Sequence, residues 1–106
     1  MIKDKEPKYV ISVTARMVGM ETHTLRYYEK LGLVCPYRSK GNIRYYSEND
    51  IDQLRRVKSL VNDLGINPAG VEVIMDMSKK MLRMQHTIER LEDELHKLRG
   101  RAAGQE

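Results

Sequence analysis

A chain of 106 residues, 41% apolar and 32% charged, has the size of one compact domain with an appendage and excludes two domains that each bury a large core. Its formal charge of +4 arises entirely in residues 1–66, which hold twelve Lys and Arg against eight Asp and Glu, whereas residues 67–106 hold seven of each. A basic half joined to a neutral, highly charged half is typical of a polyanion-binding module attached to an interaction helix, although an ordinary basic surface would give the same counts.

Several protein classes are excluded by what the sequence lacks. No run approaches the roughly 18 apolar residues that span a bilayer, and the charged start is unlike a signal peptide, so we expect a cytoplasmic protein with no membrane partner. A single cysteine, Cys35, excludes an internal disulfide and a cysteine-cluster metal site, and no cofactor is expected. The absence of a catalytic triad, P-loop or dinucleotide fingerprint argues against an enzyme.

An arm, a short strand and a helix are expected at the start of the chain. Residues 1–8 are polar and predict a flexible arm, and Tyr9-Val-Ile is a short β-prone run. Ser12 is suited to cap a helix from Val13 to Val18. Gly19 is expected to end this helix in a turn.

A second helix is expected within a few residues of that turn. Leu25, Tyr28 and Leu31 recur at a spacing of three, which places them on one helix face, and Gly32 is suited to end the helix. Two short helices joined by a turn that contains Gly19 make a helix-turn-helix candidate.

A hairpin with a basic tip follows the second helix. Leu33-Val-Cys-Pro-Tyr and Ile43-Arg-Tyr-Tyr predict two short strands around the polar loop 38–42, in which Gly41-Asn42 suits a tight turn. A hairpin of this kind is the form that a wing takes. Cys35, on the first of these strands, is expected to be a small buried hydrophobe in preference to a redox switch.

Two further helices are predicted from capping signals. Ser47-Glu-Asn-Asp is a close variant of the capping box, with Asp50 in place of the usual Glu or Gln, and the helix that it opens ends at Leu64-Gly65. Asn67-Pro68 then caps a helix over residues 69–77. The core-facing positions of the first of these helices are Ile51, Leu54, Val57 or Lys58, and Val61.

A last helix over residues 78–98 carries an apolar seam, whose members are separated alternately by four and three residues. Three heptads of apolar positions among charged residues need a partner helix, and the mixed charges beside them forbid neither a homodimer nor a heterodimer. The alternative is that the seam packs on the chain's own domain, but a helix about 30 Å long exceeds what so small a domain covers. The seam consists of Met77, Met81, Met84, Ile88, Leu91, Leu95 and Leu98.

These elements predict a mainly α fold with a small β wing. We expect a winged helix-turn-helix domain at residues 9–77 behind the arm at 1–8, then a coiled-coil dimerisation helix at 78–99 and a disordered tail at 100–106. Such a fold binds duplex DNA by placing its second helix in the major groove while flanking cations neutralise phosphates.

The candidate DNA contacts lie on the second helix and the wing. We expect Tyr28 to be core and its neighbour Tyr27 to be exposed, since successive helix positions diverge by about 100°. The alternative for the wing cations is that they are solvated on the hairpin and do not contact DNA. Arg55 or Arg56 could add phosphate contacts. The full set is Thr22, His23, Thr24, Arg26 and Tyr27 on the second helix, Arg38, Lys40, Asn42 and Arg44 on the wing, and Arg16 on the first helix.

Three stretches resemble the N-terminal domain of the MerR family of bacterial regulators. They are Ile11-Ser-Val-Thr-Ala-Arg-Met-Val-Gly-Met, Thr24-Leu-Arg-Tyr-Tyr-Glu-Lys-Leu-Gly-Leu-Val-Cys-Pro and Arg44-Tyr-Tyr-Ser-Glu-Asn-Asp-Ile. The resemblance covers residues 9 to about 77, and within the family Tyr9-Val-Ile-Ser-Val and Asn67-Pro-Ala-Gly-Val are most similar to the heat-shock repressor branch.

The resemblance implies a homodimer joined through antiparallel C-terminal helices, with two recognition helices that read an inverted repeat. It implies repression of stress or chaperone genes, with RNA polymerase or a DnaK-type chaperone as candidate partners. The positions that it implies against DNA are Arg16, Thr24, Arg26, Tyr27, Arg38 and Arg44.

The sequence lacks the sensor features that some members of the family carry. Metal- and redox-sensing members carry cysteines at the end of the dimerisation helix, and drug-sensing members carry a C-terminal pocket domain, but this sequence has neither. A small-molecule or metal sensor therefore fits poorly. The alternative to a regulator is an architectural or adaptor DNA-binding protein that holds DNA without regulating a gene.

Overall fold

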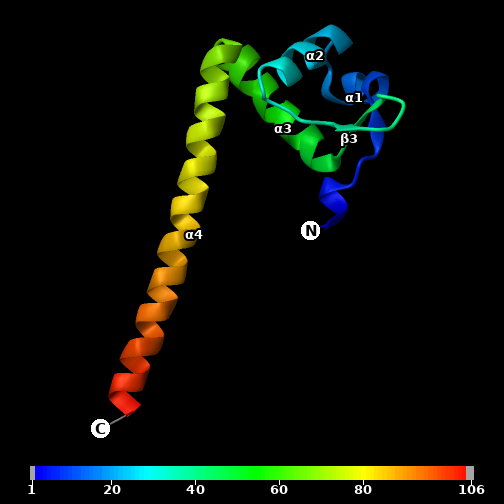
Figure 1. The fold of residues 1–106 in the computed structure, drawn as a ribbon. Coiled ribbons are helices and arrows are strands. Elements are labelled where there is room, and N and C mark those ends of the chain that lie inside the picture. The colour runs from blue at the N-terminus through cyan, green and yellow to red at the C-terminus, as the bar shows by residue number, and fades with distance from the viewer. Residues whose placement is uncertain (1, 105–106) are drawn as a thin grey trace. The chain divides into compact units, whose positions relative to one another are not determined.

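The computed structural model describes residues 2–104, and side chains from residue 4 onward (Figure 1). The chain divides into two compact units, of which the first ends at Val73 and the second begins at Ile74. No helix in the described part of the chain is long and apolar enough to cross a membrane. The elements, in order, are η1 (Ile2–Lys5), β1 (Tyr9–Val10), α1 (Ile11–Val18), α2 (Thr22–Lys30), β2 (Tyr37–Arg38), β3 (Arg44–Tyr46), α3 (Glu48–Lys58), η2 (Ser59–Asp63) and α4 (Pro68–Gly104).

The start of the chain is more regular than the sequence predicts. Residues Ile2–Lys5 form the short 3-10 helix η1 where a flexible arm is expected, and the backbone N–H of Lys8 donates to the carbonyl of Tyr46 at 3.1 Å. Met1, which belongs to the predicted arm, lies outside the described residues. Residue 8 is therefore tied to the sheet through β3.

Helix α1 begins earlier than predicted, and Ser12 is not its cap. The N-cap is Val10, which makes no side-chain capping bond. The cause is the sheet, because Val10 pairs with Tyr45 and the chain turns directly from strand into helix. The predicted end is confirmed, since Gly19 takes the left-handed conformation with φ +69°.

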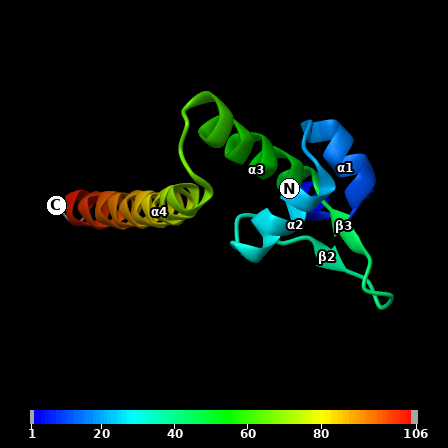
Figure 2. The same ribbon diagram turned by 90° about the horizontal axis from the view of Figure 1, so that it is seen from above.

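The sheet has three antiparallel strands in the order β1-β3-β2, and its β2–β3 hairpin points away from the helices of the first unit (Figure 2). The first wing strand is shorter than predicted, because Leu33 and Val34 are buried in the core ahead of it and Pro36 has no N–H for a ladder. Cys35 lies between Val34 and Pro36 and is exposed, so the expectation of a buried cysteine is wrong.

The core of the first unit is built on α3, which packs against α1 and β3 (Figure 2). Its capping box is confirmed: Ser47 Oγ accepts the N–H of Asp50 at 3.1 Å, and the Asp50 carboxylate accepts the N–H of Ser47 at 2.9 Å. Of the two alternatives on this helix, Val57 is core, whereas Lys58 donates to the carbonyl of Val18 at 3.0 Å. The fully buried side chains include Leu25, Leu33, Val34, Tyr46, Ile51, Leu54, Val57 and Val71.

Residues Pro68–Gly104 form one continuous helix, α4. Asn67 Oδ1 accepts the N–H of Gly70 at 2.8 Å and caps α4 as predicted, but no break separates residues 69–77 from 78–98, because that junction holds no Gly or Pro. The helix also runs through Gly100 to Gly104, where a disordered tail is expected, since one glycine costs only about 1 kcal/mol. Residues 105–106 of that tail lie outside the described residues.

Candidate nucleic-acid interface

Helix α2 presents one face to the core and the other to solvent. Leu25 is fully buried and Tyr28 is 6% exposed, whereas Tyr27 is 49% exposed, so the predicted division between the two tyrosines is confirmed. Burial raises the pKa of the Tyr28 hydroxyl above its usual value, and the adjacent Tyr27 adds to the shift. Anchoring by Leu25 and Tyr28 therefore fixes the rotation of α2 about its axis and determines which side chains face outward.

The outward face of α2 carries the sequence-predicted residues. His23 and Arg26 are exposed, and Thr22 and Thr24 are half-buried. Thr22 also lines an open notch between α1 and α2, together with the exposed Arg16. The structure thus brings the first-helix cation and the start of the second helix to one surface.

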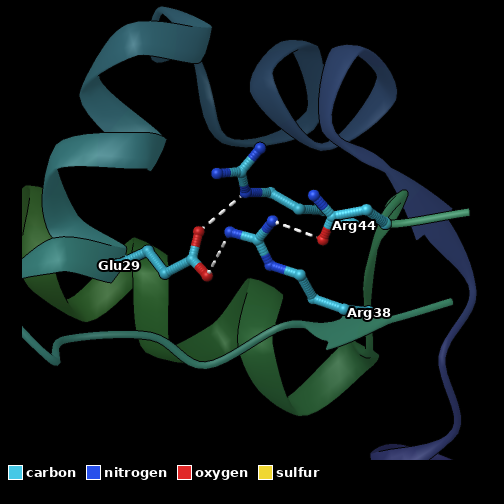
Figure 3. A network of polar contacts seen from close by, with 4 residues as sticks. Glu29, Arg38 and Arg44 are labelled. Atoms are coloured by element: carbon cyan, nitrogen blue, oxygen red, sulfur yellow. Dashed lines mark hydrogen bonds and ion pairs between the residues drawn. The ribbon is translucent and has the colours of Figure 1, made fainter. Parts of the chain in front are cut away.

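Glu29, which is not among the predicted contacts, joins α2 to the wing (Figure 3). Its Oε2 accepts from Nη2 of Arg38 on β2 at 3.0 Å, and its Oε1 accepts from Nε of Arg44 on β3 at 2.7 Å. Arg38 also donates from Nη1 to Oδ1 of Asn42 at 3.0 Å. Both predicted wing arginines are therefore held by a carboxylate of α2.

The Glu29 carboxylate is ionised in this arrangement. Burial on its own would raise the pKa of Glu29, but the hydrogen bonds and positive charges of Arg44 and Arg38 outweigh it and hold the pKa below its usual value. One negative charge faces two positive charges, so the cluster keeps a net positive charge at neutral pH.

An open hollow of about 600 Å³ lies between α2 and the wing. Five cationic or titratable side chains and one aromatic ring surround the single carboxylate. This composition suits an anionic backbone with flat bases, since arginine forks pair with phosphates and aromatic hydroxyls donate to them. The lining residues are His23, Arg26, Tyr27, Glu29, Lys30, Arg38 and Arg44.

Some predicted residues lie away from this hollow. Lys40 and Asn42 are exposed at the wing tip, where Asn42 takes φ +64°, and Arg55 and Arg56 are exposed on α3. Lys30 and Glu29 line the hollow but were not among the predicted contacts. The available signal for Glu29 is that it is the only acidic residue between Glu21 and Glu48 in a basic stretch.

The apolar seam of α4 is exposed along its whole length in the single chain. Its seven residues are between 46% and 67% exposed, while the flanking surface carries ion pairs such as Arg90 with Glu94 at 3.2 Å. Within the described residues, no cluster of three His, Cys, Asp or Glu side chains could hold a metal ion.

Comparison with known proteins agrees with this geometry. The profile of the MerR HTH family of regulatory proteins matches residues 9–78. The chain is 43% identical over 84 residues to the heat shock protein HspR of Streptomyces coelicolor, covering 79% of this chain and 56% of that protein. It is 37% identical over 73 residues to the transcriptional regulator GlnR of Bacillus cereus, covering 69% and 56%.

A more distant relative extends further along the chain. The transcriptional repressor CarA of Myxococcus xanthus is 34% identical over 98 residues, which cover 91% of this chain and 33% of that protein. The chain spans about half the length, or less, of these curated relatives. The matched profile includes the whole α1, α2 and wing surface. The chain therefore belongs to the MerR HTH family of regulatory proteins, whose members are transcription regulators and not enzymes.

Proposed function

We propose that this chain is a homodimeric, sequence-specific DNA-binding repressor that acts on an inverted-repeat operator of stress or chaperone genes. The observation that carries the proposal is the exposed cationic face formed by α2 and the wing. The similarity to HspR supports the choice of heat-shock genes, and under this proposal a DnaK-type chaperone and RNA polymerase are the candidate protein partners.

The roles of the individual side chains follow from their chemistry. Arg26 is the candidate for a bidentate contact with guanine O6 and N7, and Thr22 or Thr24 for contact with a thymine methyl or a phosphate. Tyr27 donates its hydroxyl to a phosphate, and His23 lies beside it on the same helix. Phosphate contacts are assigned to Arg16 and to the wing residues Arg38, Lys40, Asn42 and Arg44.

The dimer is assigned to α4. Six seam residues would become buried against a second copy, and desolvating this much apolar surface is the main driving force for helix association. In this proposal residues 9–77 read DNA and residues 78–99 pair the two chains. The paired residues are Met81, Met84, Ile88, Leu91, Leu95 and Leu98.

Footprinting tests the proposal directly. The purified chain is placed on the DNA upstream of its own gene and of the host's chaperone operon across a salt series. We expect a protected inverted repeat whose half-sites are separated by whole helical turns, with protection that weakens as salt rises. Arg26→Ala should abolish the footprint, whereas Arg83→Ala, which removes the same charge from an exposed position on α4, should retain it.

Two results would contradict the proposal in different ways. Salt-sensitive binding without a defined footprint would favour the architectural alternative, since counterion release alone gives binding without sequence preference. A lack of binding at low salt would remove the DNA assignment altogether. A footprint that is absent from the chaperone operon but present at the chain's own gene would support a sequence-specific regulator and reject the proposed heat-shock targets.

A further inference from the structure

A single carboxylate stands inside an otherwise cationic surface. Glu29 is the only acidic residue between Glu21 and Glu48, and it lies in the hollow that the proposed function assigns to DNA. An acidic side chain at such a place repels the phosphate backbone. Its presence there therefore calls for a role that outweighs this repulsion.

Each oxygen of the Glu29 carboxylate holds a different strand of the wing (Figure 3). Oε2 accepts from Arg38 on β2 and Oε1 accepts from Arg44 on β3. The carboxylate side chain is only 21% exposed, so the contacts are partly shielded from water. One group of the recognition helix thus fixes both strands of the hairpin at once.

The two arginines need this partner because of the strand register. Arg38 and Arg44 are directly opposite each other in the antiparallel β2–β3 pair, and like charges at directly opposite positions destabilise a sheet. The carboxylate lies between the two guanidinium groups and offsets their repulsion. Without it, the hairpin would lose a tie to α2 and gain repulsion between its own strands.

Apart from the pairing of β3 with β1 and the buried residues that flank the hairpin, few contacts hold the wing in position. Strand β2 has two residues and β3 has three, and residues 40–43 at the tip are exposed. The polar side-chain contacts between the described residues of α2 and the wing are those of Glu29. The orientation of the wing relative to the recognition helix therefore depends strongly on this carboxylate.

We propose that Glu29 is a positioning residue for DNA recognition, which holds Arg38 and Arg44 in register with the recognition helix and so favours the operator over other DNA. This inference rests on the proposed function. Fixed arginines reach phosphates only where the duplex has the geometry of the operator. Released arginines would contact the backbone of any duplex, because phosphates carry no sequence information.

The first test compares affinities for two duplexes at one salt concentration. The probes are the duplex protected in the footprint and a scrambled duplex of the same length and composition. In Glu29→Gln we expect tighter binding to the scrambled duplex, weaker binding to the protected one, and a specificity ratio at least about tenfold lower. Glu72→Gln makes the same change of charge at an exposed site on α4 and should leave the ratio unchanged.

A double-mutant cycle shows whether Glu29 acts through the wing. If it does, the Glu29→Gln and Arg44→Ala double variant should lose no more discrimination than the more severe single variant. Thermal unfolding of each variant verifies that it is folded. A specificity ratio in Glu29→Gln within twofold of the wild type, or fully additive losses in the double variant, would overturn the inference.

A second test needs no DNA and separates this inference from the proposed function. In the wild-type protein we expect an NMR signal from the Arg44 Nε–H that exchanges slowly with water, and ordered amides at residues 39–42. In Glu29→Gln the signal should be lost and the order parameters of the wing should fall toward about 0.6. If the wild type binds no DNA, the proposed function fails while this measurement still decides whether Glu29 holds the wing. Unchanged wing order would refute the coupling.

Discussion

At the scale of single residues, two buried polar groups of the core contrast with the paired groups at the surface. The hydroxyls of Thr14 and Tyr46 are buried and have no hydrogen-bond partner within the described residues. By comparison, Tyr9 at the sheet edge donates to Glu48, and this hydrogen bond raises the pKa of the tyrosine. A buried hydroxyl without a partner costs free energy, so the value of Tyr46 to the fold comes from its ring.

The titration of Tyr46 gives the first stability prediction. Burial raises the pKa of its hydroxyl to about 12, from an ordinary value of about 10. The unfolded chain loses this proton above pH 10 while the folded chain keeps it to about pH 12, so the unfolded state is favoured increasingly across that window. The contribution of the raised Tyr46 pKa to the free energy of unfolding is thus complete below pH 10. It is lost as the pH rises through the pKa of the folded state, about 12.

Tyr46→Phe isolates this effect, because it keeps the ring and removes the hydroxyl. We expect the variant to be as stable as the wild type or slightly more stable at pH 7, since no hydrogen bond of the described residues is lost. Its free energy of unfolding in urea should fall less steeply between pH 10 and 12 than that of the wild type. The exposed Tyr37→Phe is the control. Equal slopes for the wild type and Tyr46→Phe would contradict the assignment.

At the scale of elements, local signals predicted the helices better than the strands. The capping box at Ser47 and the cap at Asn67 were found because their bonds join residues three apart. The start of α1 was missed because Val10 is fixed by its pairing with Tyr45, far along the chain. The length of β2 was missed because Leu33 and Val34, which look like strand residues, are buried in the core ahead of it. Glu29 was missed because its two partners lie on two other elements, β2 and β3, and only the folded chain brings them to it.

The turn between α1 and α2 is an element whose geometry can be tested. Gly19 has φ +69°, and a Cβ there would lie 2.7 Å from Nζ of Lys58, which caps the carbonyl of Val18. Gly19→Ala should therefore lower the free energy of unfolding by about 1 kcal/mol or more. Urea denaturation at fixed protein concentration measures the change.

The matched control is Gly100→Ala on α4. Gly100 is helical and a Cβ there meets nothing within 4 Å, so alanine should stabilise the helix by up to about 1 kcal/mol. The two substitutions are chemically identical and should have opposite signs. A stabilising Gly19→Ala would show that the turn does not require the left-handed conformation.

At the scale of the whole molecule, the single chain leaves a large apolar surface in water. The seam residues of α4 are about half exposed or more, from Leu95 at 46% to Met81 at 67%, and contiguous apolar surface of this kind marks an interaction site. The fold of the first unit provides one surface for contact with DNA. Reading an inverted repeat requires two copies of that unit, which under the proposed function the seam brings together.

Ile88→Glu tests this dependence, because it places a charge at the middle of the seam. A buried carboxylate without a partner is costly enough to favour separate chains, so sedimentation should change from dimer to monomer at micromolar concentration. His86→Glu adds the same side chain two residues away, outside the apolar seam, and should leave the dimer intact.

If DNA recognition requires two linked units, the monomeric Ile88→Glu variant should still bind DNA weakly at low salt through α2 and the wing, but should lose the footprint on the inverted repeat. A variant that sediments as a dimer would instead place the contact between copies elsewhere on the chain, and a monomer with an unchanged footprint would separate operator recognition from dimerisation.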